Sequence, residues 1–184
     1  MEKERAFRRK YSINVARLGT GKHTDFFEID QDFFARFEQS EIEEGKVAAN
    51  LEIDKSPTHL DVGFHLKGEV ELPCDRCGVP YPYQLEANFR IIYSFDPEMN
   101  FEGYEVMYVN EKESHLVIVQ ELYDFIQLAL PMRRVPPKEI HLCAPEVLKM
   151  LGLDENGEPV KQAEEKETDP RWAALKGLKD QMEG

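Results

Sequence analysis

The sequence HLDVGFHLKGEVEL, residues 59–72, has the clearest periodicity in the chain, because apolar and polar side chains alternate along it. The apolar positions are Leu60, Val62, Phe64, Leu66, Val70 and Leu72. Successive side chains of a β-strand point to opposite faces, so this alternation predicts one long strand with one buried and one solvated face. Strands of this kind belong to antiparallel sheets.

The segments on either side of this stretch show the same alternation. Residues 47–53 precede it and end at the Ser56-Pro57 turn, and residues 83–95 follow it. A shorter strand is expected over 104–109, after the acidic 96–103 loop. We therefore predict an α+β fold, in which an antiparallel β-rich sheet or a partly open barrel is covered by one main helix.

Helical spacing occurs in the second half of the chain. Val119, Leu122, Ile126 and Leu130 recur at the period of a helix that ends at Pro131, and this helix is expected to cover the apolar face of the sheet. The predicted organisation is a single β-rich domain over 1–153, an acidic flexible linker over 154–168 and a short C-terminal helix over 169–184.

The amino-terminal part has weaker signals. Tyr11, Ile13 and Val15 alternate with polar residues and predict a strand that ends near 19–21. Asp30 or Asp32 is expected to cap a short helix, whose aromatic residues contribute to the core. These aromatic residues are Phe33, Phe34 and Phe37.

Composition and charge limit the classes of function. The chain has 184 residues and a formal charge of −13, and no apolar stretch is long enough to cross a bilayer. We expect a cytoplasmic monomer that makes no membrane contact. The acidity disfavours nonspecific binding of nucleic acid, although residues 1–22 carry a net +5.

Cys74-Asp75-Arg76-Cys77-Gly78 is the sharpest motif. Two thiolates separated by two residues can chelate one ion, and Gly78 permits a tight turn. With His141 and Cys143 they make a candidate Cys3His site for one structural Zn²⁺. The alternatives are reduced cysteines in a β-turn and, with less support because no βαβ unit surrounds the motif, a thioredoxin-like pair.

Catalytic motifs are few. No phosphate-binding Gly-rich loop, nucleophile elbow or HExxH pair is present. A metal hydrolase site built on His59, Asp61 and His65 is conceivable, but solvated strand residues explain these side chains better.

The C-terminal segment begins with Asp169-Pro170-Arg171, a helix start signal. Trp172, Leu175 and Leu178 then follow at spacing suited to a partner groove or to docking back on the domain. They are candidate partner-binding residues.

The order of these motifs, over roughly residues 40–180, resembles the YceD-like family of large ribosomal RNA subunit accumulation proteins. The residues that carry the resemblance are Pro73 to Cys77, the aromatic strand and acidic loop after it, Glu121-Leu122 to Met132, Cys143, and Asp169 to Trp172 with Leu175. The resemblance implies a non-enzymatic factor in the synthesis, processing or stability of large-subunit ribosomal RNA. Members often carry a second cysteine cluster after the Leu-Pro segment, where this chain has only Cys143.

An acidic factor of this kind is expected to act through protein-mediated ribosome assembly, on ribosomal proteins or a pre-ribosomal particle, with the RNA contacted indirectly. The groups expected to face any RNA are Arg8, Arg9, Lys10, Arg133 and Arg134. The alternatives are a zinc-dependent or thiol-based enzyme that uses the CxxC motif, and a structural zinc module for protein contacts unrelated to ribosomes.

Overall fold

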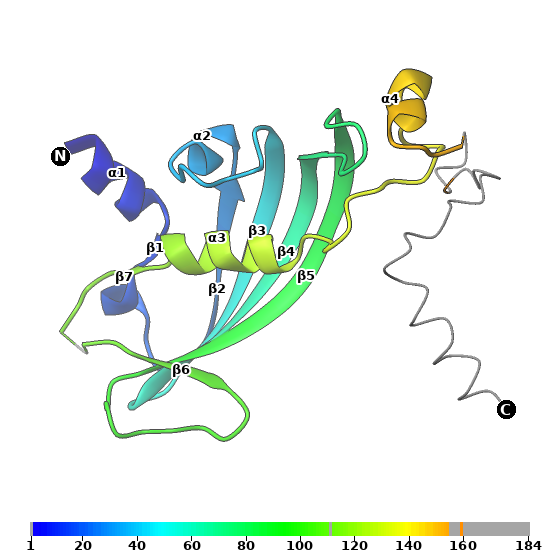
Figure 1. The fold of residues 1–184 in the computed structure, drawn as a ribbon. Coiled ribbons are helices and arrows are strands. Elements are labelled where there is room, and N and C mark those ends of the chain that lie inside the picture. Colours follow the sequence, from blue (N-terminus) through cyan, green and yellow to red (C-terminus); the bar gives the residue numbers. More distant parts are fainter. Residues whose placement is uncertain (1, 111, 155–158, 160–184) are drawn as a thin grey trace, which may run out of the picture. The chain divides into compact units, whose positions relative to one another are not determined.

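The computed structural model describes residues 2–110, 112–154 and 159, and its elements are labelled in Figure 1. Backbone contacts divide the chain into two units, Met1–Cys143 and Ala144–Gly184, which are described separately. Apart from Asp154 and Pro159, the predicted flexible linker lies outside the described residues, and so does the predicted C-terminal helix with Trp172, Leu175 and Leu178. The predicted domain boundaries stay predictions.

The first unit is built on one five-stranded sheet in the order β2-β3-β4-β5-β6. Its strands are β2 (Gly21–Ile29), β3 (Gly45–Lys55), β4 (His59–Pro73), β5 (Pro80–Ser94) and β6 (Glu105–Tyr108). Strands β2 to β5 form an antiparallel meander, in which the alternation predicts β3, β4 and β5 but not β2. β2 and β6 lie at opposite edges, so the sheet is open (Figure 1).

The direction of β6 differs from the prediction of an antiparallel sheet. β6 runs parallel to β5, with Glu105 opposite Ile91 and Tyr108 opposite Ser94. The 95–104 loop carries the chain back along β5 before it re-enters the sheet, and parallel neighbours need such a return connection. The fold is α+β with a mixed sheet.

The inner face of the sheet forms the core. Phe64 at the centre of β4 lies opposite Leu51 of β3 and Phe89 of β5. Helix α3 (Val119–Leu128) covers this face, where the Phe125 ring stacks on Phe89 with centroids 4.4 Å apart. The helix predicted to cover the sheet is therefore present.

The amino-terminal segment differs most from its prediction. Residues Glu2–Lys10 form helix α1, and only Ser12–Ile13 form a strand, β1, which pairs with β7 (Leu116–Val117). A 3₁₀ turn, η1 (Val15–Arg17), follows. The alternation in this segment predicts burial correctly, because Tyr11, Ile13 and Val15 are all buried. A longer strand would need a longer neighbouring strand to pair with, and β1 pairs with β7 over only two residues.

Two short helices complete the description. Asp30 caps α2 (Gln31–Phe34), where its carboxylate accepts a hydrogen bond of 3.2 Å from the Phe33 N–H, and Phe33 and Phe34 are fully buried as predicted. The second unit contains α4 (Pro145–Met150). None of the helices in the described part of the chain is long and apolar enough to cross a membrane.

Candidate metal centre

The turn between β4 and β5 holds the first two candidate ligands, Cys74 and Cys77. The Gly78 N–H donates to the Cys74 carbonyl at 2.8 Å, and the Cys74 N–H donates to the Val79 carbonyl at 3.1 Å. Gly78 has φ +72°, in the left-handed region that favours glycine. The CxxCG sequence therefore folds into a tight turn with both thiols on one side of the chain.

A second segment, residues 131–143 after α3, reaches this turn through Arg134. The Asp75 N–H donates to the Arg134 carbonyl at 2.9 Å, and the Arg134 N–H donates to the Asp75 carboxylate at 2.7 Å. The Arg134 guanidinium also pairs with Glu41. These contacts position the segment that carries His141 and Cys143.

The four predicted ligands come together at one point. Cys74, Cys77, His141 and Cys143 each offer one donor atom, and the four atoms lie within 4.8 Å of one another. The sulfurs of Cys74 and Cys143 are 3.8 Å apart. Two thiolates on one tetrahedral Zn²⁺ are also separated by about 3.8 Å, given Zn–S bonds of about 2.3 Å.

The contact between Cys77 and His141 is tighter than in a metal site. The Cys77 sulfur lies 3.0 Å from Nε2 of His141, against about 3.5 Å expected across a tetrahedral zinc. This pair has to separate by about half an ångström for an ion to enter. The donor set fits zinc in number, type and spacing with that one adjustment.

The thiols in the cluster differ in acidity. Burial acts to raise the pKa of Cys74, but hydrogen bonds from the backbone of Arg76 and Cys77 outweigh it, so its pKa is lowered. Burial and contacts with the other two thiols raise the pKa of Cys143 to about 12. One thiolate is thus favoured in the metal-free cluster, and a cation would favour all three.

The arrangement has the character of a structural site. Four protein donors would fill all four positions of a tetrahedral zinc and leave none for a reactive water or a substrate, whereas catalytic zinc sites keep one position open. Cys74 is buried and the other three residues are half-buried. A bound ion would join the β4–β5 turn to the segment that follows α3.

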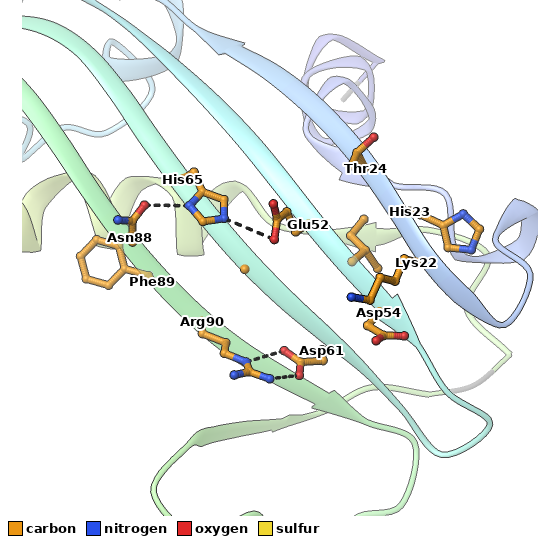
Figure 2. Close-up of a pocket in the computed structure, with 12 residues that line it drawn as sticks. Lys22, His23, Thr24, Glu52, Asp54, Asp61, His65, Asn88, Phe89 and Arg90 are labelled. Carbon is orange, nitrogen blue, oxygen red and sulfur yellow. Dashed lines mark hydrogen bonds and ion pairs between the residues drawn. The ribbon is translucent and has the colours of Figure 1, made fainter.

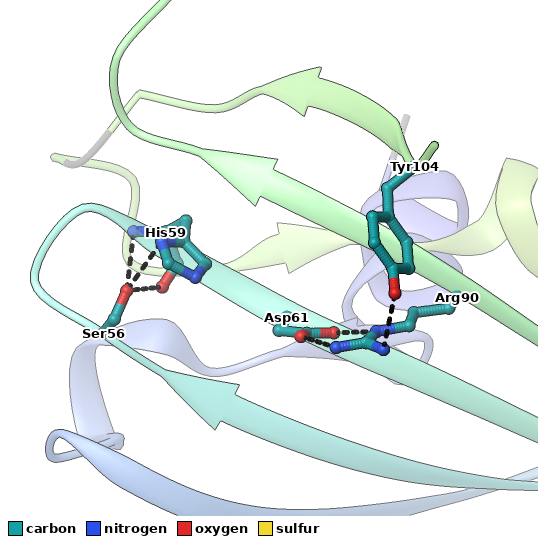
Figure 3. A network of polar contacts seen from close by, with 5 residues as sticks. All are labelled: Ser56, His59, Asp61, Arg90 and Tyr104. Atoms are coloured by element: carbon teal, nitrogen blue, oxygen red, sulfur yellow. Dashed lines mark hydrogen bonds and ion pairs between the residues drawn. The ribbon is translucent and has the colours of Figure 1, made fainter. Parts of the chain in front are cut away.

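The histidines on the outer face of the sheet belong to separate networks. His59 contacts the Ser56 hydroxyl at 2.8 Å through Nδ1, and Asp61 is held by Arg90, whose guanidinium lies over the Tyr104 ring (Figure 3). His65 lies farther along β4.

His65 lines a shallow hollow of about 670 Å³ on this face (Figure 2). Its Nδ1 lies 2.7 Å from the Asn88 amide oxygen, and its Nε2 lies 3.8 Å from the Glu52 carboxylate. Within the described ranges, only the four residues Cys74, Cys77, His141 and Cys143 form a cluster suited to a metal. The hydrolase hypothesis gains no geometric support.

The predicted RNA-facing cations have different environments. Arg8 and Arg9 on α1 are exposed, and so is Arg133. Lys10 pairs with Asp30 at 3.4 Å, and only 18% of the Arg134 side chain is exposed. Sequence reasoning missed the structural role of Arg134 and Asp75, because no local pattern predicts a contact between residues so far apart.

Comparison with known proteins gives one result. Neither a curated protein nor a solved structure matches the chain. Residues 62–179 match the family described as "Large ribosomal RNA subunit accumulation protein YceD", and this range contains all four candidate ligands. Because the match covers more than half of the 184 residues and agrees with the order of motifs, the chain belongs to the YceD family of large ribosomal RNA subunit accumulation proteins.

Proposed function

We propose that this chain is a non-enzymatic cytoplasmic factor that promotes the accumulation of large-subunit ribosomal RNA by binding proteins of the pre-ribosomal particle. The family description supplies the process. The Cys3His donor set supports the non-enzymatic part of the proposal. It is the best-formed candidate site in the described residues, and its four ligands would leave no open position for a substrate.

The metal part of the proposal is one structural Zn²⁺ held by Cys74, Cys77, His141 and Cys143. When bound, the ion would supply a cross-link and no reaction step. The chain's own residues prepare the site, since the Asp75 to Arg134 hydrogen bonds already hold the two ligand-bearing segments together.

Charge supports a protein partner over bare RNA. The formal charge of −13 repels phosphates, and complementary charge favours basic partners such as ribosomal proteins. Two of the five cations expected to face RNA, Lys10 and Arg134, are already paired with carboxylates.

The test compares cells that lack the chain with cells complemented by variants. We expect loss of the chain to lower the ratio of large-subunit to small-subunit ribosomal RNA, and the tagged chain to co-sediment with large-subunit precursors. His59→Ala and His65→Ala should restore the ratio fully. An unchanged ratio in cells lacking the chain would refute the proposed function, and failure of either histidine variant would favour a hydrolase.

A further inference from the structure

A groove of about 500 Å³ lies between α3 and the edge strand β6, away from the candidate metal centre. Its walls carry three carboxylates, Glu105 from β6 and Glu121 and Asp124 from α3. Asp124 accepts a hydrogen bond of 2.8 Å from the Gln120 amide. Among the described residues no lysine or arginine forms an ion pair with any of the three.

The floor and rim of the groove are apolar. Ile91 and Phe125 are buried at its base. Met107 and Leu128 stand at its edge with 39% and 71% of their surface exposed, which is high for large apolar side chains. The groove thus combines an apolar surface for a hydrocarbon chain with negative charge at its walls.

Two buried polar side chains, Tyr93 and Gln127, lie at or beside the same groove. The Tyr93 side chain is completely buried, and its hydroxyl lies close to the Glu121 carboxylate, although no hydrogen bond of normal geometry joins them. Burial and the neighbouring carboxylate of Glu121 raise the pKa of Tyr93, and burial raises the pKa of Glu121. The Gln127 amide nitrogen, which also lines the groove, is buried without an acceptor.

We propose that the groove between α3 and β6 binds an arginine or lysine side chain from a basic protein segment. The hydrocarbon stem lies on Ile91, Met107 and Phe125, as long basic side chains do on apolar surfaces. The cationic end is held by charge-assisted hydrogen bonds from the carboxylates, and Gln127 donates to a backbone carbonyl of the segment.

This inference rests on the proposed function, for which it names the partner chemistry. RNA does not suit the groove, because three carboxylates repel phosphate groups. A basic protein segment supplies both the cation and the backbone carbonyl that the unpartnered groups lack.

The first experiment titrates the full chain with a synthetic ten-residue peptide containing four arginines. The variant Glu105→Gln/Glu121→Gln/Asp124→Asn should bind at least about tenfold more weakly, the loss expected when a charge-assisted hydrogen bond is removed. The control Glu43→Gln/Glu44→Gln/Glu71→Gln removes the same charge from exposed positions elsewhere and should lose less than about twofold. Equal losses would overturn the proposal, because they would show attraction by net charge alone.

A second pair of variants tests occupancy of the groove without removing a carboxylate. Leu128→Arg places a cation at the rim and should compete with the peptide, whereas Met132→Arg makes the same change in charge at a fully exposed position after α3. Thermal unfolding checks that both variants fold. Peptide binding that is unaffected by Leu128→Arg would contradict the proposal.

Nuclear magnetic resonance locates the contact directly. The peptide should shift the signals of Met107 and Leu128, while a single-stranded RNA of ten uridines should not. Shifts from the RNA, or peptide shifts elsewhere only, would overturn the inference. These outcomes are independent of ribosomal RNA levels in cells, so failure here is distinguishable from failure of the proposed function.

Discussion

Gly68 lies on the inner face of β4, opposite Val47 of β3, where the two backbones approach closely. A Cβ atom at Gly68 would lie 2.1 Å from the Lys46 carbonyl oxygen and 2.6 Å from the Val47 Cα, both backbone atoms that cannot rotate away. The strands curve strongly around the core (Figure 1). The absence of a side chain at this residue therefore permits the close approach of the β3 and β4 backbones.

Gly68→Ala is predicted to lower the free energy of unfolding by roughly 2–4 kcal/mol, because backbone atoms of β3 have to shift. Urea unfolding measures the change. Gly63→Ala on the same strand is the control, because the nearest atom would be 3.7 Å away, an ordinary contact, and its effect should stay below about 1 kcal/mol. Similar losses of stability in both variants would show that the close backbone contact at Gly68 is not the cause.

Individual core residues could be predicted from the sequence more reliably than individual contacts. The alternation in β3 and β4 predicts burial of Leu51, Ile53 and Phe64, and all three are buried. The link between Asp75 and Arg134 spans 59 residues and depends on two backbone N–H groups, which carry no side-chain signature.

Helices and strands with a regular pattern of apolar residues were predicted from the sequence. Features that depend on the neighbouring strand or loop were not. β3, β4, β5 and α3 each keep one period over their length. β2 was missed because the adjacent Phe26 and Phe27 break its alternation. The parallel direction of β6 depends on the path of the 95–104 loop, which no period encodes.

The candidate site was predicted better than its surroundings. A single Cys pair together with the only other cysteine and a nearby histidine is enough to identify Cys74, Cys77, His141 and Cys143 from the sequence, and the structure brings their donor atoms together. The groove between α3 and β6 was missed because its residues come from β5, β6 and α3, and only the fold places them side by side.

Removal of the metal is predicted to loosen the β4–β5 turn and residues 131–143. Purified without chelator, the chain should contain about one zinc with protected thiols, and a chelator should increase amide exchange in residues 131–143 and the β4–β5 turn more than in β3. Mass spectrometry of exchanged peptides measures the difference.

Two variants test whether the protection depends on the ligand Cys143. Cys143→Ser should lose zinc and show the same increased exchange, while Leu142→Ser, an exposed neighbour, should retain both zinc and protection. Full protection without zinc would show that the Asp75 to Arg134 hydrogen bonds suffice to hold the segment.

We expect the charge of the complete chain to favour protein partners over RNA. The formal charge of the whole chain is −13, whereas helix α1 is basic and none of its residues is buried, so that Arg8 and Arg9 are exposed. Any attraction for RNA is expected to be local and sensitive to salt.

A single-stranded RNA should therefore bind with a Kd weaker than about 10⁻⁵ M at physiological salt, within the range of nonspecific binding. Arg8→Ala/Arg9→Ala should weaken this residual binding several-fold, and Lys46→Ala/Lys112→Ala, which removes the same charge elsewhere, should change it less. Fluorescence anisotropy at two salt concentrations gives both values. Tight binding with little salt dependence would identify RNA as a direct ligand.

The cysteine cluster also bears on the order in which parts of the chain fold. Cys74 and Cys143 are 69 positions apart, and the stretch between them contains β5, β6, β7 and α3. Closing so long a loop is entropically costly until the intervening elements have formed. We therefore expect the four donors to meet late, and an ion held by all four would mark a chain in which β5, β6, β7 and α3 have already formed.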